Sequence, residues 1–257
     1  MVNFVKRVWS NQNNGPITPE VFNHLEDGIE EAINLASSSG QSSGLESRIA
    51  SLEDAVADLS YVALALSSST ISPASAALGS TVSSFEVNYS FNKVPATVTL
   101  KQGSTTLQTI AAPSSATGRI SMVNQTITSD TTFTLSGIDE RDHAASSTIK
   151  IEFMNYVYYG AANAPQSVDS AFVTGLASNV LSKTKARTVT INATGSKYIW
   201  YAIPSRLGTP VFTVGGFEGG FSLAGTISVT NGAGYAENYA VYKSDNAGLG
   251  STKVVIS

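Results

Sequence analysis

The sequence predicts a mainly β protein with N-terminal helices. A short parallel coiled coil would join identical chains, and two β-sandwich domains of Ig-like architecture would follow it. Three observations predict this fold class. Apolar residues recur at steps of three and four near the N-terminus, apolar and polar residues alternate in short runs over most of the remaining chain, and 21 glycines with abundant serine and threonine separate those runs. Hydrophobic residues make up 42% of the 257 positions, which is enough to build cores.

The composition excludes several classes of function. The chain has no cysteine, so cysteine-based zinc sites and thiol nucleophiles are excluded. Its net charge is −4 and it has no basic run, which argues against binding to nucleic acid. It has no apolar signal-peptide region, and no stretch approaches the roughly 18 apolar residues of a membrane span. We therefore expect a protein made in the cytoplasm, with no membrane insertion and no export by the ordinary secretory signal.

Residues 1–20 are predicted to form an N-terminal attachment segment, and residues 21–66 a helical and coiled-coil region. Thr18 has the side chain of a helix cap, and Pro19 suits the first helical position, where a backbone N–H has no partner within the helix. A Ser/Gly-rich stretch at residues 37–44 is predicted to be a flexible break between two helical segments.

The second helical segment carries an apolar stripe with a heptad period. The members of this stripe are Leu45, Ile49, Leu52, Val56 and Leu59. With the leucines at d positions, Arg48 falls at g and Glu53 at e, which is the spacing of an ion pair between chains. The stripe is therefore predicted to be the seam of a parallel homo-oligomer. Ile and Val at a with Leu at d favour a dimer, but so few heptads leave the number of chains open.

An ordinary amphipathic helix packed on its own β domain is the alternative for this stripe. Polar linkers rich in serine are predicted on both sides of it, at residues 37–44 and 66–73. Such linkers leave nothing nearby to cover the apolar side chains, so another copy of the chain is the favoured partner.

Residues 67–157 are predicted to form an Ig-like β-sandwich, because about seven short strands separated by turns are typical of that architecture. One predicted strand places alternate side chains on a single face, namely Phe85, Val87, Tyr89 and Phe91. A hairpin is predicted with its turn at residues 101–104, and the last strand has Ile149, Ile151 and Phe153 in alternation. There is no cysteine pair, so the domain would be Ig-like in architecture only.

Residues 158–257 are predicted to form a second β-sandwich, entered through a short connector at residues 158–167. This part is rich in aromatic side chains, and sugar rings stack on the faces of Trp and Tyr. The candidate saccharide contacts are Tyr198, Trp200, Tyr201 and Tyr239. Packing in the core and between subunits is the alternative, and it is the more common role for such residues.

No catalytic, cofactor or metal site is predicted. The densest polar cluster comprises Asp139, Glu140, Asp142 and His143. A hard cation needs about six to eight oxygen ligands and this loop lacks EF-hand spacing, so a solvated loop with local hydrogen bonds is favoured. The chain has two histidines and no G-x-S-x-G motif, and nothing places Glu218 and Glu237 together as a catalytic pair. The glycine-rich residues 214–221 are predicted to form turns rather than a phosphate cradle. We therefore expect no enzyme.

Three stretches of the chain resemble tail and baseplate appendage proteins of tailed bacteriophages. "VWSNQNNGPITPEVFNHLEDGI" is similar to an N-terminal motif of many phage tail proteins, although residues 23–29 depart slightly from its usual order. The stretch from "SSFEVNYSFNKVPATVTL" to "STIKIEFMNYVYYG" is similar to an Ig-like module of tail-fibre and baseplate proteins. The stretch from "ARTVTINATGSKYIWYAIP" to "YAENYAVYKSDNAGLGS" resembles a module found beside it.

This resemblance implies a homotrimer in a virion that assembles in the host cytoplasm. Trp9 and Pro19 would lie in the segment that attaches to other virion proteins, and the C-terminal domains would face the host surface. The resemblance supplies no catalytic residue. We therefore expect a tail fibre or baseplate component that presents its β domains to a host-surface glycan. The alternative is a purely structural virion protein, such as a head fibre or baseplate spacer, without receptor contact.

Overall fold

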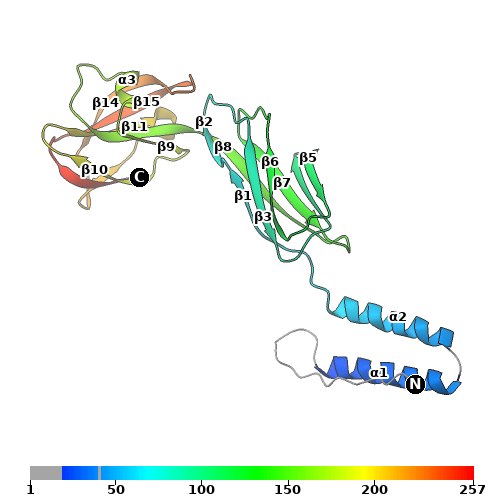
Figure 1. Cartoon of the computed structure of the whole chain (residues 1–257). Helices are drawn as coiled ribbons and strands as arrows, with labels where there is room; N and C mark the ends of the chain where they lie inside the picture. Colours follow the sequence, from blue (N-terminus) through cyan, green and yellow to red (C-terminus); the bar gives the residue numbers. More distant parts are fainter. Residues whose placement is uncertain (1–18, 40–41) are drawn as a thin grey trace. The chain divides into compact units, whose positions relative to one another are not determined.

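The computed structural model describes residues 19–39 and 42–257. They divide into a helical unit, which ends at Ala63, and a β unit, Leu64–Ser257 (Figure 1). The protein is mainly β, as the sequence predicts, with antiparallel pairing throughout except for one parallel pair. Trp9 and Thr18 lie outside the described residues.

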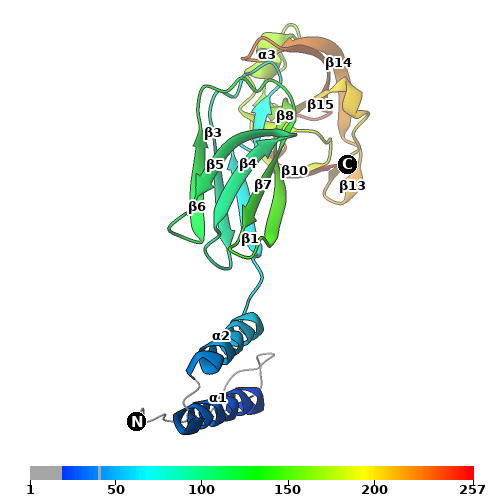
Figure 2. The same cartoon turned by 90° about the vertical axis from the view of Figure 1, so that its right-hand side faces the viewer.

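The helical unit is a hairpin of two helices, α1 (Pro19–Ser39) and α2 (Ser42–Leu59). The two helices contact each other and run in opposite directions (Figures 1 and 2). The break predicted at residues 37–44 is shorter than expected, because most of those residues are helical. Ser37 fits into the helix by donating its hydroxyl to the carbonyl oxygen of Ile33 at 2.9 Å. Pro19 is the first residue of α1, the position that suits a proline.

The apolar stripe is the half-buried face of α2. Between residues 44 and 59 the half-buried side chains are those of Leu45, Ile49, Leu52 and Val56, whereas Leu59 is 47% exposed. Helix α2 packs against α1 of the same chain. Among the described residues of this unit, only Ala32 is buried, so the hairpin covers the stripe incompletely.

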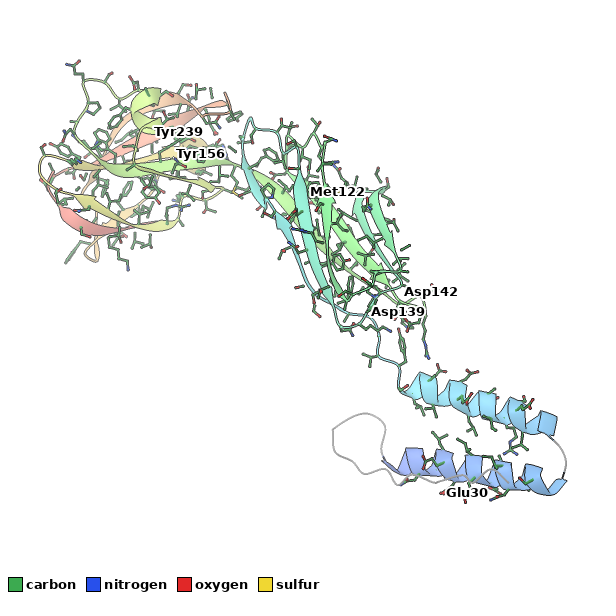
Figure 3. All side chains as sticks on the ribbon, in the orientation of Figure 1. Glu30, Met122, Asp139, Asp142, Tyr156 and Tyr239 are labelled. Atoms are coloured by element: carbon green, nitrogen blue, oxygen red, sulfur yellow. The ribbon has the colours of Figure 1, made fainter. Side chains whose placement is uncertain are left out.

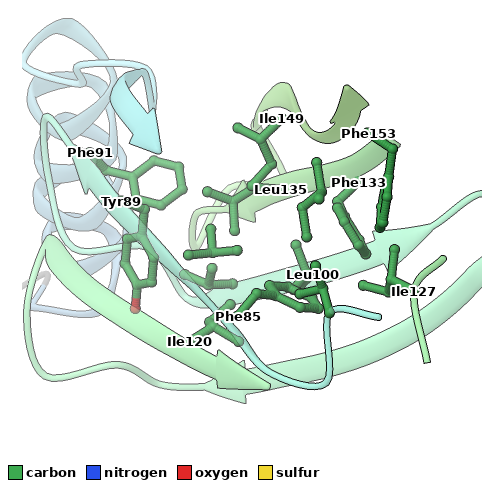
Figure 4. Close-up of a cluster of buried hydrophobic side chains, with 14 of the residues drawn as sticks. Phe85, Tyr89, Phe91, Leu100, Ile120, Ile127, Phe133, Leu135, Ile149 and Phe153 are labelled. Atoms are coloured by element: carbon green, nitrogen blue, oxygen red, sulfur yellow. The ribbon is translucent and has the colours of Figure 1, made fainter. Parts of the chain in front are cut away.

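The first core of the β unit lies between two sheets. One sheet has the strand order β1-β3-β6, and the facing part of the large sheet has the order β8-β7-β4-β5, with β2 added beside β8. The bounds are β1 (Leu66–Ser72), β2 (Ser75–Ala77), β3 (Phe85–Phe91), β4 (Thr97–Gln102), β5 (Thr105–Ala111), β6 (Thr117–Met122), β7 (Thr131–Ile138) and β8 (Ala144–Ala162). Figure 4 shows the aromatic and aliphatic side chains that fill this core.

Two local predictions for the first core are confirmed. The four alternate side chains of β3, from Phe85 to Phe91, are all buried, and the ring of Phe85 lies 4.8 Å from that of Phe133. Strands β4 and β5 form the predicted hairpin, whose turn includes Gly103 at a φ of 58°. Glycine adopts this positive φ without the steric penalty that a side chain would impose.

The linker predicted at residues 66–73 is a strand instead. These residues form β1, which pairs antiparallel with β3 and places Ile71 opposite Val87. Threonine and isoleucine favour strands, and the partly buried side chain of Ile71 packs against the first core. Three of the serines that suggested a linker, Ser67, Ser68 and Ser72, are exposed on this edge strand, whereas Ser69 is half-buried.

Strand β8 belongs to both cores. Its first half pairs with β7, and its second half pairs with β11 (Tyr198–Pro204). The connector predicted at residues 158–167 therefore begins later than expected, because residues 158–162 are strand. Tyr158 and Gly160 are buried there, so this segment forms part of a covered sheet rather than an exposed linker.

The second core lies between the other end of the large sheet and a separate sheet. The large sheet continues as β14-β15-β11-β8, with β9 beside β8, and the separate sheet has the order β10-β16-β12-β13. The bounds are β9 (Ser178–Ser182), β10 (Arg187–Ala193), β12 (Phe212–Val214), β13 (Phe217–Glu218), β14 (Phe221–Thr230), β15 (Ala236–Ser244) and β16 (Gly250–Ile256). A 3₁₀ turn, η1 (Ser205–Leu207), follows β11.

A short helix covers the outer face of the large sheet. Helix α3 (Ser170–Thr174) is capped by Asp169, whose carboxylate accepts from the backbone N–H of Phe172 at 2.8 Å. Val173 packs with Trp200 of β11 in a cluster distinct from the one between the sheets. Strand β11 is consequently buried on both faces.

Candidate functional site

The aromatic residues predicted to contact a saccharide are mostly buried, with Tyr201 in the second core and Trp200 and Tyr239 in the separate cluster beneath α3. Trp200, Tyr201 and Tyr239 are 2%, 1% and 2% exposed. A sugar needs an exposed ring face for stacking, and these three side chains present none in the described chain. Their burial agrees with the alternative interpretation, which is packing in the core. Tyr198 is half-buried, and the ammonium of Lys243 lies 4.5 Å from the centre of its ring.

The polar atoms of these buried aromatics bond to backbone oxygens. The indole N–H of Trp200 donates to Ala162 at 3.1 Å, and the hydroxyl of Tyr201 donates to Lys185 at 3.2 Å. Burial raises the pKa of Tyr201 to about 12, against a lowering influence of Arg187. The role of these polar groups is therefore to satisfy hydrogen bonds inside the fold.

Arg48 and Glu53, which were predicted to pair between chains, do not pair with each other within one chain. Arg48 and Glu53 are both exposed on α2, where their side chains remain accessible to a second copy.

The acidic loop between β7 and β8 is organised by one buried carboxylate. Asp139 is 2% exposed, and its Oδ1 accepts from the backbone N–H groups of Arg141 and His143, each at 3.0 Å. Its Oδ2 lies 2.9 Å from the ammonium of Lys93, which also approaches Glu140 at 3.4 Å. Asp139 therefore bonds to the backbone of its own loop and pairs with Lys93 of the segment after β3, so this carboxylate is buried rather than solvated.

The remaining acids and glycines are also engaged in local structure. Glu237 pairs with Arg206 at 2.7 Å and accepts a hydrogen bond from the buried amide of Asn155, whereas Glu218 is exposed on β13. In residues 214–221 four glycines have positive φ, as expected for turns. Across residues 19–39 and 42–257, no group of three histidine, aspartate or glutamate side chains could hold a metal ion.

A groove where the two cores meet is the strongest candidate site. Its volume is about 630 Å³, within the roughly 300–1,000 Å³ range of small-molecule sites. Strand β2 contributes from the first core, and α3, β9 and the loop after β14 contribute from the second. Strand β8, common to both cores, supplies Tyr156 and Tyr158, whose ring centres are 5.7 Å apart. Figure 3 labels Tyr156 beside Tyr239 in this region.

Several polar groups that line the groove have no partner. Within the described chain, the hydroxyls of Tyr156 and Tyr158 and the side-chain amide of Asn179 make no hydrogen bond. By contrast, Ser80 donates to Ala77 at 2.6 Å. Burial raises the pKa of Tyr158, and the neighbouring Tyr156 raises it further. Tyr158 therefore presents a neutral hydroxyl at ordinary pH.

The backbone of the groove is fixed by bonds between the two cores. The side-chain amide of Asn231 donates to the carbonyl oxygen of Leu78 at 2.8 Å. The ammonium of Lys183 bridges Asp130 at 2.5 Å and Glu152 at 3.0 Å, which joins β9 to the end of the first core. The hydroxyl of Tyr239 donates to the carbonyl oxygen of Tyr156 at 2.7 Å.

Sequence reasoning did not identify this groove. Tyr156 and Tyr158 stand two positions apart in "FMNYVYYG", so a strand places them on one face. That spacing was the available signal, but it does not show what lies opposite. Ser75 and Asn179 reach the same groove from distant parts of the chain because β2 and β9 both pair with β8. Gly232 reaches it in the loop after β14, which Asn231 ties to Leu78.

None of the described helices is both long enough and apolar enough to span a membrane. A scan against protein-family models and a search of curated proteins found no match to this chain.

Proposed function

We propose that this chain is a structural and adhesive virion appendage, a tail-fibre or baseplate component whose β unit is presented to the host surface. The observation that carries the proposal is the continuity of β8 through both cores. One strand of 19 residues, together with the bonds of Asn231 and Lys183, couples the two cores without a flexible linker. Such a coupling suits a part that holds a binding surface away from its attachment point. The proposed role is mechanical and adhesive, and it requires no catalytic group.

The strand order supports an Ig-like assignment for the first core. Strands β1, β3 and β6 form one sheet, β5, β4, β7 and β8 form the other, and β2 adds to β8 in parallel. Antiparallel sheets of three and four strands with this kind of crossing connectivity are typical of Ig-like domains. The assignment agrees with the resemblance of this stretch to an Ig-like module of phage tail proteins.

The helical hairpin supports assembly of several copies. Among the described residues of its two helices, which have 21 and 18 residues, only Ala32 is buried, and the stripe from Leu45 to Val56 is half-buried. Short helices gain most of their stability from packing, so covering this stripe by further copies of the hairpin is favourable. We propose a trimer, as the resemblance implies, in which Arg48 and Glu53 pair between chains. Three copies would also strengthen weak surface contacts through effective concentration.

Light scattering or sedimentation equilibrium of the full chain tests this proposal. We expect the mass of three chains at micromolar concentration, and we expect Leu52→Asp to dissociate them because a charge would enter the seam. Ala50→Asp is the matched control, since residue 50 is exposed on the same helix. A monomeric wild-type chain, or equal effects of the two substitutions, would refute assembly through the stripe.

A purely structural virion part, such as a head fibre or baseplate spacer, is the second candidate. The burial of Trp200, Tyr201 and Tyr239 favours it, because the most aromatic stretch of the chain is used for packing. This candidate predicts an assembled protein that binds no host glycan at all.

A further inference from the structure

We propose that the groove between the two cores, lined by Tyr156, Tyr158 and Asn179, binds a neutral saccharide. This inference rests on the proposed adhesive function and gives it a site and a ligand class. The groove replaces the aromatic face predicted around Trp200, which the fold buries.

The lining of the groove selects against charged ligands. Among the described residues, no aspartate, glutamate, lysine or arginine lines it. A phosphate, sulfate or carboxylate would lose water there without gaining a positive partner, which is unfavourable in a partly enclosed site. The ligand that fits this electrostatic environment is neutral.

The free polar groups select for a ligand with many hydroxyls. The hydroxyls of Tyr156 and Tyr158 and the amide of Asn179 can each donate and accept, and the described chain leaves them without partners. A purely apolar ligand would bury these groups unsatisfied, at a cost for each one. A sugar has alternating donors and acceptors around its ring, so it can satisfy them.

Apolar surface stands beside those polar groups. The ring of Tyr156 lines the groove together with Ala76, Ala77 and Leu181, whereas Tyr158 is 4% exposed and contributes its hydroxyl rather than a ring face. Sugar rings combine C–H faces with polar edges, and tyrosine provides the same combination of an apolar body and a polar tip. Because apolar surface and polar groups line the same groove, a saccharide fits it better than a lipid or an ion does.

The groove is already formed without ligand. Tyr239 holds the carbonyl of Tyr156, and Asn231 holds the loop that carries Gly232 against the first core. A site whose backbone is fixed in advance loses less entropy when it binds, so a small contact area can still be selective.

The test uses the full chain on an array of neutral glycans and of sialylated, sulfated and phosphorylated glycans. We expect binding to neutral members only. Titration of the best neutral oligosaccharide, followed by NMR, should then shift the signals of Tyr156, Tyr158 and Asn179. Tyr156→Phe and Asn179→Ala should each weaken binding by roughly two- to tenfold, the effect of losing one neutral hydrogen bond. Asn238→Ala is the control for Asn179, because Asn238 is exposed on β15, away from the groove lining.

A blocking substitution gives the sharper result. A side chain at Gly232 would meet no atom within 4 Å of its Cβ, so Gly232→Trp should fold normally and fill the groove. We expect it to abolish glycan binding, whereas Gly225→Trp, at an equally open glycine outside the groove lining, should leave binding intact.

The outcomes separate this inference from the proposed function. The proposed saccharide site would be refuted if the assembled chain bound no neutral glycan, preferred anionic glycans, or bound equally well with Gly232→Trp. None of these results would contradict the appendage role. A monomeric chain that binds neutral glycans through the groove would instead support the site and refute the trimeric appendage.

Discussion

The side-chain amide of Asn231 donates a hydrogen bond to the carbonyl oxygen of Leu78, 153 positions earlier in the chain, at 2.8 Å. The amide oxygen of the same residue accepts from the backbone N–H groups of Ala233 and Tyr235, at 2.9 and 3.1 Å. Asn231 is buried, so both halves of its amide are used in a site shielded from water. One side chain therefore shapes the loop after β14 and ties that loop to the first core.

Asn231→Asp should destabilise the β unit by about 1–3 kcal/mol, the usual cost of leaving a shielded acceptor, here the carbonyl oxygen of Leu78, without its donor. The carboxylate keeps the two bonds from Ala233 and Tyr235, but it cannot donate to Leu78 and places a negative charge beside that carbonyl. Urea unfolding at pH 7 measures the effect. Asn238→Asp, on the exposed face of β15, is the control and should change the free energy of unfolding by less than about 0.5 kcal/mol. Equal effects at residues 231 and 238 would show that the hydrogen bond from Asn231 to Leu78 does not stabilise the contact between the two cores.

Gly79→Ala should be more destabilising than Gly234→Ala, although both glycines have similar positive φ values of 88° and 81°. The two substitutions share a backbone penalty of about 1–2 kcal/mol. At Gly79 the new Cβ would also lie 2.7 Å from the Cβ of Tyr235, whereas at Gly234 it would meet nothing within 4 Å. The difference between the unfolding free energies of the two variants therefore measures the cost of the steric clash between residue 79 and Tyr235, where the two cores approach each other. Identical unfolding free energies would mean that the contact between the two cores rearranges to accommodate the added methyl group.

The Lys183 bridge should contribute stability above about pH 4 and lose it in acid. Hydrogen bonding to Lys183 lowers the pKa of Asp130 below its ordinary 3.8, and bonds from Lys150 and then Lys183 lower the pKa of Glu152 below 4.5. A carboxyl whose pKa is lower in the folded state stabilises that state above the unfolded pKa, and this contribution disappears as pH falls through the folded pKa. Asp130 and Lys183 are exposed and Glu152 is half-buried, so the effect is small and sensitive to salt.

Lys183→Met provides the measurement for this bridge. The difference in unfolding free energy between wild type and variant should be constant near pH 6–7, shrink as pH falls below about 4, and also shrink in 1 M salt. Lys197→Met is a suitable control, since Lys197 forms no ion pair among the described residues. A difference that is independent of both pH and salt would show that Lys183 acts through packing alone.

Local pattern was sufficient to predict much of the fold. The alternation from Phe85 to Phe91 predicted a buried strand face, and the three–four spacing of Leu45, Ile49 and Leu52 predicted the half-buried face of α2. Both predictions depend only on the period of an element. The partner of each face is a different matter, because it is set by tertiary contacts. The stripe of α2 accordingly meets α1 of the same chain, a contact that its heptad spacing could not specify.

The same distinction explains why Trp200 was named as a candidate saccharide contact although it is buried. Trp200 and Tyr201 lie on opposite faces of β11, and one face of such a strand is usually exposed to solvent. Here α3 covers the outer face, and its sequence is too short to give a helical period, so the burial of Trp200 could not be inferred. For residues 66–72 the error was the reverse. Their serine-rich sequence suggested an exposed linker, but their backbone forms a strand that pairs with β3.

Asp139→Asn should destabilise the loop between β7 and β8 by about 1–2 kcal/mol while leaving the first core folded. The amide oxygen of asparagine can still accept from the N–H groups of Arg141 and His143, but the charge that faces Lys93 at 2.9 Å is lost. Thermal unfolding measures the loss. Glu140→Gln is the matched control, because Glu140 approaches the same lysine from an exposed position at 3.4 Å and should contribute little. Millimolar Ca²⁺ should leave the melting temperature of the wild type unchanged, because one oxygen of the Asp139 carboxylate is bonded to the loop backbone and the other pairs with Lys93. A rise in melting temperature with Ca²⁺ that Asp139→Asn removes would instead identify this loop as a cation site.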